Sequence, residues 1–173
     1  MTDINSPSDH SADSSAGAVP SDNDIDLIEL LFFAYRDFIS DPDAILAEYG
    51  FGRAHHRVLH FVDRNPGLTV ADLLNILNIT KQSLARVLKQ LVDSGFIEQQ
   101  PGSSDRRQRL LYTTGDGGKL ALQLLEPQSR RIRNAFQNME PNARRIVSSF
   151  LFDMIDKAEQ PNVRRLIGKE KPD

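Results

Sequence analysis

The chain has 173 residues, a formal net charge of -3, and neither cysteine nor tryptophan. This length suffices for one domain with a sizeable core. Without cysteine the chain has neither disulfide support nor thiol-based redox sensing. No stretch approaches the roughly 18 uninterrupted apolar residues of a membrane span, and the N-terminus lacks the basic and apolar regions of a signal peptide. We therefore expect a soluble, cytoplasmic protein without a membrane partner.

The charge is divided unevenly along the chain. Residues 1–50 carry eleven Asp or Glu and one basic residue, Arg36. Residues 51–113 carry nine Lys or Arg against five Asp or Glu, and residues 114–173 carry eleven against eight. The acidic overall composition therefore does not argue against a polyanionic partner, because the middle segment is basic by itself.

The N-terminal third predicts a tail followed by apolar helices. Residues 1–23 are rich in Ser, Asp and Pro and almost free of large apolar side chains, which predicts a disordered acidic tail. Residues 24–40 repeat apolar side chains at helical spacing. The apolar stripe of this helix is wider than one core needs, which indicates burial on two sides, as at a subunit interface.

The chain is expected to restart after this helix. Asp41 is a suitable cap, Pro42 fits a first helical position, and Gly50 ends the segment. A further helix is predicted over 53–67, where Asn-Pro-Gly forms the stop.

Two helices in tight succession are predicted next. Thr69 caps the first, and Asp72 stands at the position of a capping-box partner. Thr80 caps the second, which runs to about residue 94, where Gly95 supplies a left-handed C-terminal position.

A β-hairpin is predicted to follow these helices. The segments FIEQQ (96–100) and RLLYT (109–113) are β-prone and are separated by a loop that contains Pro-Gly. Two helices followed by a hairpin predict a winged helix-turn-helix in a mainly α fold with a small β-hairpin wing.

The C-terminal third is predicted to be helical. A helix over 120–139 is expected to be interrupted by a kink at Pro127, and the preceding TTGDGG is a poor helix former. A long apolar stripe predicts a last helix over 141–158, and the tail 159–173 is expected to be partly ordered through Val163, Leu166 and Ile167.

Enzyme motifs are not found in the sequence. It contains neither a Gly-rich phosphate loop nor a nucleophile elbow, and GDGGK lacks the spacing of a phosphate-binding loop. An enzyme is therefore the least favoured class, and no cofactor is expected.

Two histidines keep a metal site open as an alternative. His56 and His60 are four residues apart on one predicted helix, a spacing that can hold a metal, with Glu48 a conceivable third ligand. We favour the interpretation that these histidines and His55 belong to the scaffold helix, and their protonation near neutral pH is a third interpretation.

The polar face of the second helix of the pair is suited to DNA. Gln and Ser can read base edges, Arg reads guanine, and Lys and Thr reach phosphate, although a merely solvated helix face would have a similar composition. The candidate residues on this helix are Thr80, Lys81, Gln82, Ser83, Arg86 and Lys89.

The predicted hairpin tip adds a second candidate DNA contact. Arg106, Arg107 and Arg109 lie on a Gly/Ser-rich loop that can approach a groove closely, and a narrow minor groove attracts arginine. Asp105 is expected to hold the guanidinium of Arg107 through a charge-assisted bond.

These residues resemble the wing of the MarR family of transcriptional regulators. The family signature Asp-x-Arg-x-x-x-Leu-x-Leu-Thr falls on Asp105, Arg107, Leu111 and Thr114, with Thr113 in place of the second Leu. LVDSGFIEQQ also resembles the family's step into the wing, without the Arg that commonly follows it. The resemblance covers roughly residues 24–158, and LLFFAYRDFISDPDAILAEYGFGRAHHRVLHFVDR further resembles the PetP-type subgroup.

The resemblance implies a homodimer whose terminal helices interlock and whose two winged lobes enter successive major grooves of double-stranded DNA. Members repress or activate transcription, and many release DNA when a small phenolic or other anionic effector binds between the dimerisation and DNA-binding parts. The organisation expected from residues and resemblance together is a tail (1–23), N-terminal dimerisation and scaffold helices (24–67), a winged helix-turn-helix DNA-binding domain (68–114), C-terminal dimerisation helices (115–158) and a tail (159–173).

Two alternatives to a sequence-specific DNA-binding regulator remain open at this point. The winged helix could be a protein-interaction module, because this fold also docks proteins. Such a module is expected to expose apolar groups on its second helix. The other alternative is a metal-sensing regulator that uses His56 and His60.

Overall fold

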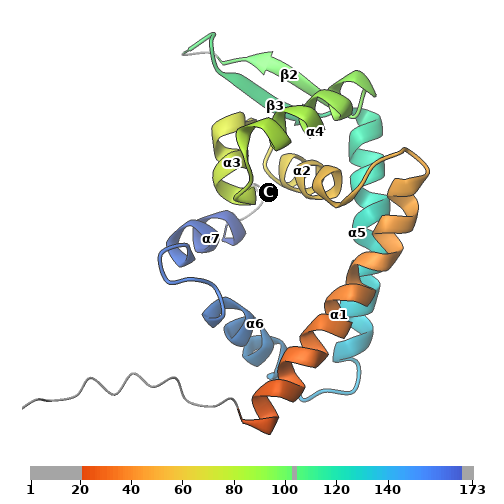
Figure 1. Ribbon diagram of the computed structural model, residues 1–173, viewed down its shortest axis with the longest axis vertical. Helices are drawn as coiled ribbons and strands as arrows, with labels where there is room; N and C mark the ends of the chain where they lie inside the picture. Colours follow the sequence, from red (N-terminus) through yellow and green to blue (C-terminus); the bar gives the residue numbers. More distant parts are fainter. Residues whose placement is uncertain (1–20, 103–104, 169–173) are drawn as a thin grey trace, which may run out of the picture. The chain divides into compact units, whose positions relative to one another are not determined.

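A computed structural model describes residues 21–102 and 105–168 of the chain. The chain divides into two compact units, of which the first ends at Arg36 and the second begins at Asp37. Figure 1 labels the helices and two strands of the small sheet, β2 and β3. The boundary between the units falls inside α1 (Asp22–Ala47), so that each unit contains part of this helix.

The first unit contains the start of α1, two residues earlier than the sequence predicts. The hydroxyl of Ser21 accepts from the backbone N–H of Asp24 at 3.2 Å, and the Asp24 carboxylate accepts from the backbone N–H of Ser21 at 3.1 Å. This reciprocal pair satisfies N–H groups that a helix start leaves without partners. Hydrogen bonds from Ser21 hold the pKa of the Asp24 carboxyl below its usual value. The predicted tail boundary at residue 23 is therefore wrong, and residues 1–20 lie outside the described residues.

Large apolar side chains cover the surface of this first unit. Phe32 is 68% exposed and Leu30 is 62% exposed. The exposed apolar side chains are Ile25, Leu27, Ile28, Leu30, Leu31, Phe32, Phe33 and Tyr35. The wide apolar stripe predicted for this helix is thus present. Most of its side chains are exposed rather than packed against other described residues.

The predicted restart at residue 41 is wrong, because α1 continues to Ala47 with Pro42 inside the helix and buried. A proline has no N–H to donate to the carbonyl four residues earlier, here that of Phe38. The Phe38 carbonyl instead accepts from the side-chain amide of Gln128 at 3.4 Å. Asp41 does not cap a helix, and its carboxylate pairs with Arg131 at 3.2 Å. The helix therefore tolerates Pro42 because a residue far along the chain supplies the missing donor.

Three helices of the second unit surround one core: α2 (Arg53–Arg64), α3 (Val70–Leu77) and α4 (Lys81–Asp93). α2 ends three residues before the predicted stop. The capping box of Thr69 with Asp72 is confirmed, and so is the positive φ of Gly95, at 76°. The guanidinium of Arg57 donates to the carbonyl of Leu77 at 2.9 Å, which ties α2 to the end of α3. The fully buried apolar side chains of these helices are Val58, Leu59, Val62, Leu73, Leu84 and Leu91.

The sheet has three antiparallel strands, one more than the sequence predicts. β2 (Ile97–Pro101) pairs with β3 (Arg109–Thr113) in the predicted hairpin, with Gln99 opposite Leu111. The additional strand β1 (Leu68–Thr69) pairs with the other edge of β3, so that the order is β1-β3-β2. A strand of two residues has no periodicity by which a sequence pattern could reveal it.

The segment after the wing forms one helix, α5 (Gly115–Phe136), with the buried Pro127 inside it. Its glycine-rich start is explained by close packing. A Cβ on Gly117 would lie 1.9 Å from the carbonyl oxygen of Phe96, so only glycine fits there. The Thr114 hydroxyl caps the helix by accepting from the N–H of Gly117 at 3.0 Å.

The last predicted helix is shorter than expected, and a further helix follows it. α6 (Ala143–Asp153) ends five residues before the predicted boundary, and α7 (Gln160–Ile167) forms from the expected tail. Val163 and Leu166 of α7 are half-buried, as expected for a partly ordered tail, whereas Ile167 is 71% exposed. No helix within the described residues is long and apolar enough to cross a membrane.

Candidate nucleic-acid interface

The helix α4 presents one buried and one exposed face. Its start is fixed by Thr80, whose hydroxyl accepts from the backbone N–H of Ser83 at 3.2 Å and donates to the Ser83 hydroxyl at 2.9 Å. Both hydroxyl groups therefore help to form the cap, and the first turn of the helix is rigidly defined. The predicted cap at Thr80 is confirmed.

All six candidate residues from Thr80 to Lys89 are exposed. Lys81, Gln82 and Arg86 make no hydrogen bond or ion pair with any other described residue, so their polar groups can bind a ligand without first losing a partner. The ammonium of Lys89 pairs with the carboxylate of Asp93 one turn later. Lys89 is thus the candidate whose charge is already partly compensated.

The tip of the hairpin is a hydrogen-bonded turn. The backbone N–H of Gln108 donates to the carbonyl of Asp105 at 3.0 Å, which places Arg106 and Arg107 at the two corner positions. The N–H of Gly102 donates to the Gln108 carbonyl at 3.1 Å and closes the base of the loop. A Cβ on Gly102 would lie 2.8 Å from the carbonyl oxygen of Asp105, so the loop requires glycine at this position.

Asp105 contacts Arg107 in a different way from the one predicted. Its carboxylate accepts from the backbone N–H of Arg107 at 2.8 Å. The expected ion pair with the guanidinium is not present among the described residues. A carboxylate that accepts from the backbone two residues later stabilises a turn, so Asp105 shapes the loop and leaves the arginine side chains exposed.

Thr113, the departure from the family signature, makes a contact of its own. Its hydroxyl donates to the carboxylate of Asp63 on α2 at 3.2 Å. The hydrogen bond joins the base of the wing to the scaffold helix, where a leucine could offer only apolar packing.

The histidine nearest the start of α2 is buried and links this helix to α4. His55 is 9% exposed and stacks on Phe51, with ring centroids 4.6 Å apart. Its Nδ1 accepts from the backbone N–H of Gly52 at 3.1 Å, and its Nε2 lies 2.9 Å from the side-chain oxygen of Gln90. The sequence-based candidates stop at Lys89 and omit Gln90, because no local pattern reveals a partner 35 residues away.

His56 and His60 lie side by side on α2 with ring centroids 6.5 Å apart. Burial lowers the pKa of both imidazoles, with His60 adding to the effect on His56 and Arg64 adding to the effect on His60. Within the described residues, no group of three or more His, Asp or Glu side chains is placed to hold a metal ion. In the described part of the chain, the pair thus has no third ligand of the kind that a metal site needs.

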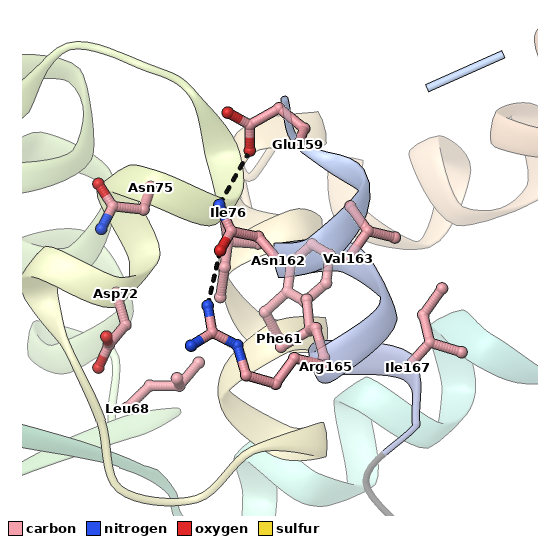
Figure 2. A pocket seen from close by; sticks show the side chains of 11 residues that line it. Phe61, Leu68, Asp72, Asn75, Ile76, Glu159, Asn162, Val163, Arg165 and Ile167 are labelled. Carbon is pink, nitrogen blue, oxygen red and sulfur yellow. Dashed lines mark hydrogen bonds between the residues drawn. The ribbon is translucent and has the colours of Figure 1, made fainter. Parts of the chain in front are cut away.

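A cleft of about 480 Å³ lies between the C-terminal helix α7 and the helix-turn-helix (Figure 2). Its apolar wall includes Phe61, Leu68 and Ile76. The guanidinium of Arg165 donates to the side-chain oxygen of Asn162 at 2.6 Å, which leaves its other N–H groups without partners among the described residues. The cleft thus combines apolar walls with one guanidinium that has donors to spare.

Comparison with known proteins assigns a family to this architecture. Residues 49–108 match a family model described as "MarR family". The chain is 50% identical over 110 residues to the HTH-type transcriptional regulator PetP of Rhodobacter capsulatus, a match that spans 64% of this chain and 66% of that relative.

Solved structures share the fold. A MarR transcriptional regulator from Methanosarcina mazei is 25% identical, with a TM-score of 0.61 over 75% of this chain and 94% of that one. Streptococcus pneumoniae FabT, solved in complex with DNA, is 15% identical, with a TM-score of 0.66 over 75% of this chain and 93% of that one. At this identity the second likeness concerns the fold alone.

Proposed function

This chain belongs to the MarR family of transcriptional regulators, and we propose that it binds a pseudo-palindromic operator in double-stranded DNA as a homodimer. The observation that carries the proposal is the pairing of an exposed polar and cationic face on α4 with a hydrogen-bonded arginine turn at the wing tip. We place the protein in the cytoplasm, where bacterial DNA lies.

The two parts of the interface have different roles in this proposal. Gln82, Ser83 and Arg86 meet base edges in the major groove, where each base pair has a distinct pattern of donors and acceptors. Thr80, Lys81 and Lys89 lie toward the phosphates. The wing residues Arg106, Arg107 and Arg109 enter the minor groove, which attracts arginine but resolves base identity poorly.

Exposed apolar helices support a homodimer. Besides the apolar side chains at the start of α1, four apolar side chains on α6 and at its C-terminal cap are at least half exposed: Ile146, Phe150, Leu151 and Met154. Contiguous apolar surface of this kind marks interaction sites in soluble proteins. A two-fold dimer would bind half-sites whose centres are about 10 bp apart, one helical turn of DNA.

The composition of the α4 surface favours DNA over a protein partner. A docking helix would expose large apolar side chains, as α1 and α6 do. The exposed positions of α4 are Lys81, Gln82, Ser83, Ala85, Arg86, Lys89, Gln90 and Asp93. Apart from one alanine, all of these side chains are polar or charged.

We extend the proposal to a small-molecule effector in the cleft beside α7. The cleft has the volume of many ligand sites, and Arg165 has N–H groups that a carboxylate or phenolate could bind. One wall belongs to the helix-turn-helix and the other to the C-terminal helix, so a bound molecule would contact both. If a panel of small aromatic acids leaves thermal unfolding of the protein unchanged, the proposed effector class is wrong.

The DNA-binding proposal is tested by comparing a substitution in the wing with a substitution in α4, because the two should change DNA binding differently. Arg107→Ala should weaken binding to all operator variants and reduce the salt dependence by about one unit of slope per lost contact. Arg86→Ala should instead relax the preference at one base pair in each half-site, at roughly 1–3 kcal/mol of discrimination. The measurement is affinity for a panel of operator variants at two salt concentrations.

A matched control is Arg130→Ala. It removes an exposed arginine of α5, which belongs neither to α4 nor to the wing. It should leave operator preference unchanged. If Arg107→Ala preserves both affinity and salt slope while the protein stays folded, the wing does not touch DNA, and a protein-interaction module becomes the better interpretation.

A further inference from the structure

We infer that Gln90 is an additional DNA-contacting residue, and that the buried ring of His55 holds its side-chain amide as a donor to a phosphate oxygen. The inference rests on the proposed DNA-binding function. Gln90 is exposed and follows Ser83 and Arg86 at helical spacings of seven and four residues, so the three side chains share one stripe of α4. It lies one turn beyond Arg86, about 6 Å along the helix axis.

The hydrogen bonds of His55 determine which way the Gln90 amide points. Nδ1 accepts from the backbone N–H of Gly52 at 3.1 Å, so this nitrogen carries no proton. The proton of the neutral ring is therefore on Nε2, which donates to the Gln90 oxygen at 2.9 Å. With its oxygen turned to the ring, Gln90 has its two N–H donors left over, and these make no hydrogen bond to any described residue.

This orientation selects a phosphate over a base. Glutamine reads adenine with its oxygen and its nitrogen together, as a bidentate pair on one base edge. The oxygen of Gln90 already accepts from the ring of His55, and turning the amide so that both of its atoms meet one base edge would break that hydrogen bond. The two N–H donors of the amide stay available, and they fit the phosphate oxygens, which only accept.

His55 is a positioning residue because its own ring is held by both nitrogens and one face. It is 9% exposed, both nitrogens have partners, and one face stacks on Phe51 with an angle of 8° between the rings. The ring cannot rotate to release Gln90 without losing the contact with Gly52 as well. The donor direction of Gln90 is therefore set before DNA binds.

The first experiment uses Gln90→Met and Gln90→Glu in the full chain, with operator duplexes selected from a random pool by the wild type. Gln90→Met removes a neutral donor, so affinity should fall roughly three- to tenfold for each protomer, equally for all operator variants. The salt slope should stay unchanged, because a neutral group displaces no counterion. Gln90→Glu retains an oxygen for His55 but faces phosphate with a negative charge, so the loss should be larger and greatest at low salt.

The second experiment tests positioning by a double-mutant cycle with His55→Phe, which keeps an aromatic ring beside Phe51. His55→Phe should lower DNA affinity about as much as Gln90→Met, and the double variant should lower it no further. A merely structural role would reduce the free energy of unfolding and leave the two effects on DNA affinity additive. If His55→Phe does not fold, the two Gln90 variants decide the inference by themselves.

The outcomes separate this inference from the proposed function. Wild-type affinity in Gln90→Met, or a loss confined to one base pair, would overturn the phosphate contact even if Arg86→Ala and Arg107→Ala behave as expected. A wild-type protein that selects no duplex at all would instead refute the DNA-binding proposal.

Discussion

Asp105 stabilises the backbone of the wing. Two substitutions that both remove its charge, Asp105→Asn and Asp105→Ala, should therefore have different effects on DNA binding. Its carboxylate accepts from the N–H of Arg107 at 2.8 Å, a bond that an asparagine oxygen can also accept. Asp105→Asn should therefore keep operator affinity at or slightly above the wild-type level, whereas Asp105→Ala should lower it several-fold by loosening the turn. The check is affinity at two salt concentrations, and an equal loss in both variants would mean that Asp105 holds a guanidinium after all.

His56 and His60 make a second prediction at the scale of single residues. Burial lowers the pKa of both from the usual 6.5, so the folded protein binds fewer protons than the unfolded chain below that pH. Stability is then unaffected at higher pH and falls as the pH drops from about 6.5 toward the lower folded pKa values. His60→Gln should reduce this fall, which chemical denaturation between about pH 8 and about pH 5.5 can measure. An unchanged pH profile in His60→Gln would contradict the expected role of burial.

At the scale of helices, the proline inside α1 depends on a side chain of α5. Gln128 is buried and donates to the Phe38 carbonyl, which Pro42 leaves without its helical partner. Gln128→Leu should destabilise the protein by about 1–3 kcal/mol, the cost of a partly buried carbonyl left without a donor.

Two comparisons identify the cause of that loss. In a Pro42→Ala background the helix regains an N–H for Phe38, so Gln128→Leu should cost clearly less. Arg131→Ala removes the neighbouring exposed ion pair with Asp41 and should change the free energy of unfolding by less than about 1 kcal/mol. Equal costs of Gln128→Leu in both backgrounds, measured by denaturant unfolding, would show that the amide does not replace the proline's missing donor.

The helices and the hairpin show which parts of the fold and of the candidate interface can be predicted from the sequence. Thr80, Gly95 and the hairpin obey rules that act over a few residues, and the structure has them where the sequence places them. Pro42 follows the local rule for a helix start, but Gln128, 86 positions away, supplies a donor that no local pattern reveals. Gln90 was missed for the same reason, because its role comes from His55 on another helix.

At the scale of the whole molecule, we predict an obligate dimer that buries on the order of 2,000 Å² or more. Sedimentation at micromolar concentration should give twice the mass of the chain. Phe32→Asp and Phe150→Asp each place a charge on an exposed apolar helix and should dissociate or unfold the protein. Gln99→Asp adds the same charge at an exposed polar site of the wing and should leave the mass unchanged. A folded wild-type monomer at this concentration would rule out an obligate dimer.

The hydrogen-bonded turn at the wing tip has a consequence for the entropy of binding. A loose loop would lose conformational freedom when its arginines enter a groove, and that loss would weaken the complex. Here the bonds from Gly102, Arg107 and Gln108 already restrict the backbone, so less freedom remains to be lost on contact. Such pre-organisation lengthens the lifetime of a complex without adding a contact to it. The glycine and aspartate of the wing, neither of which needs to touch DNA, would then help to determine how long the protein stays on its operator.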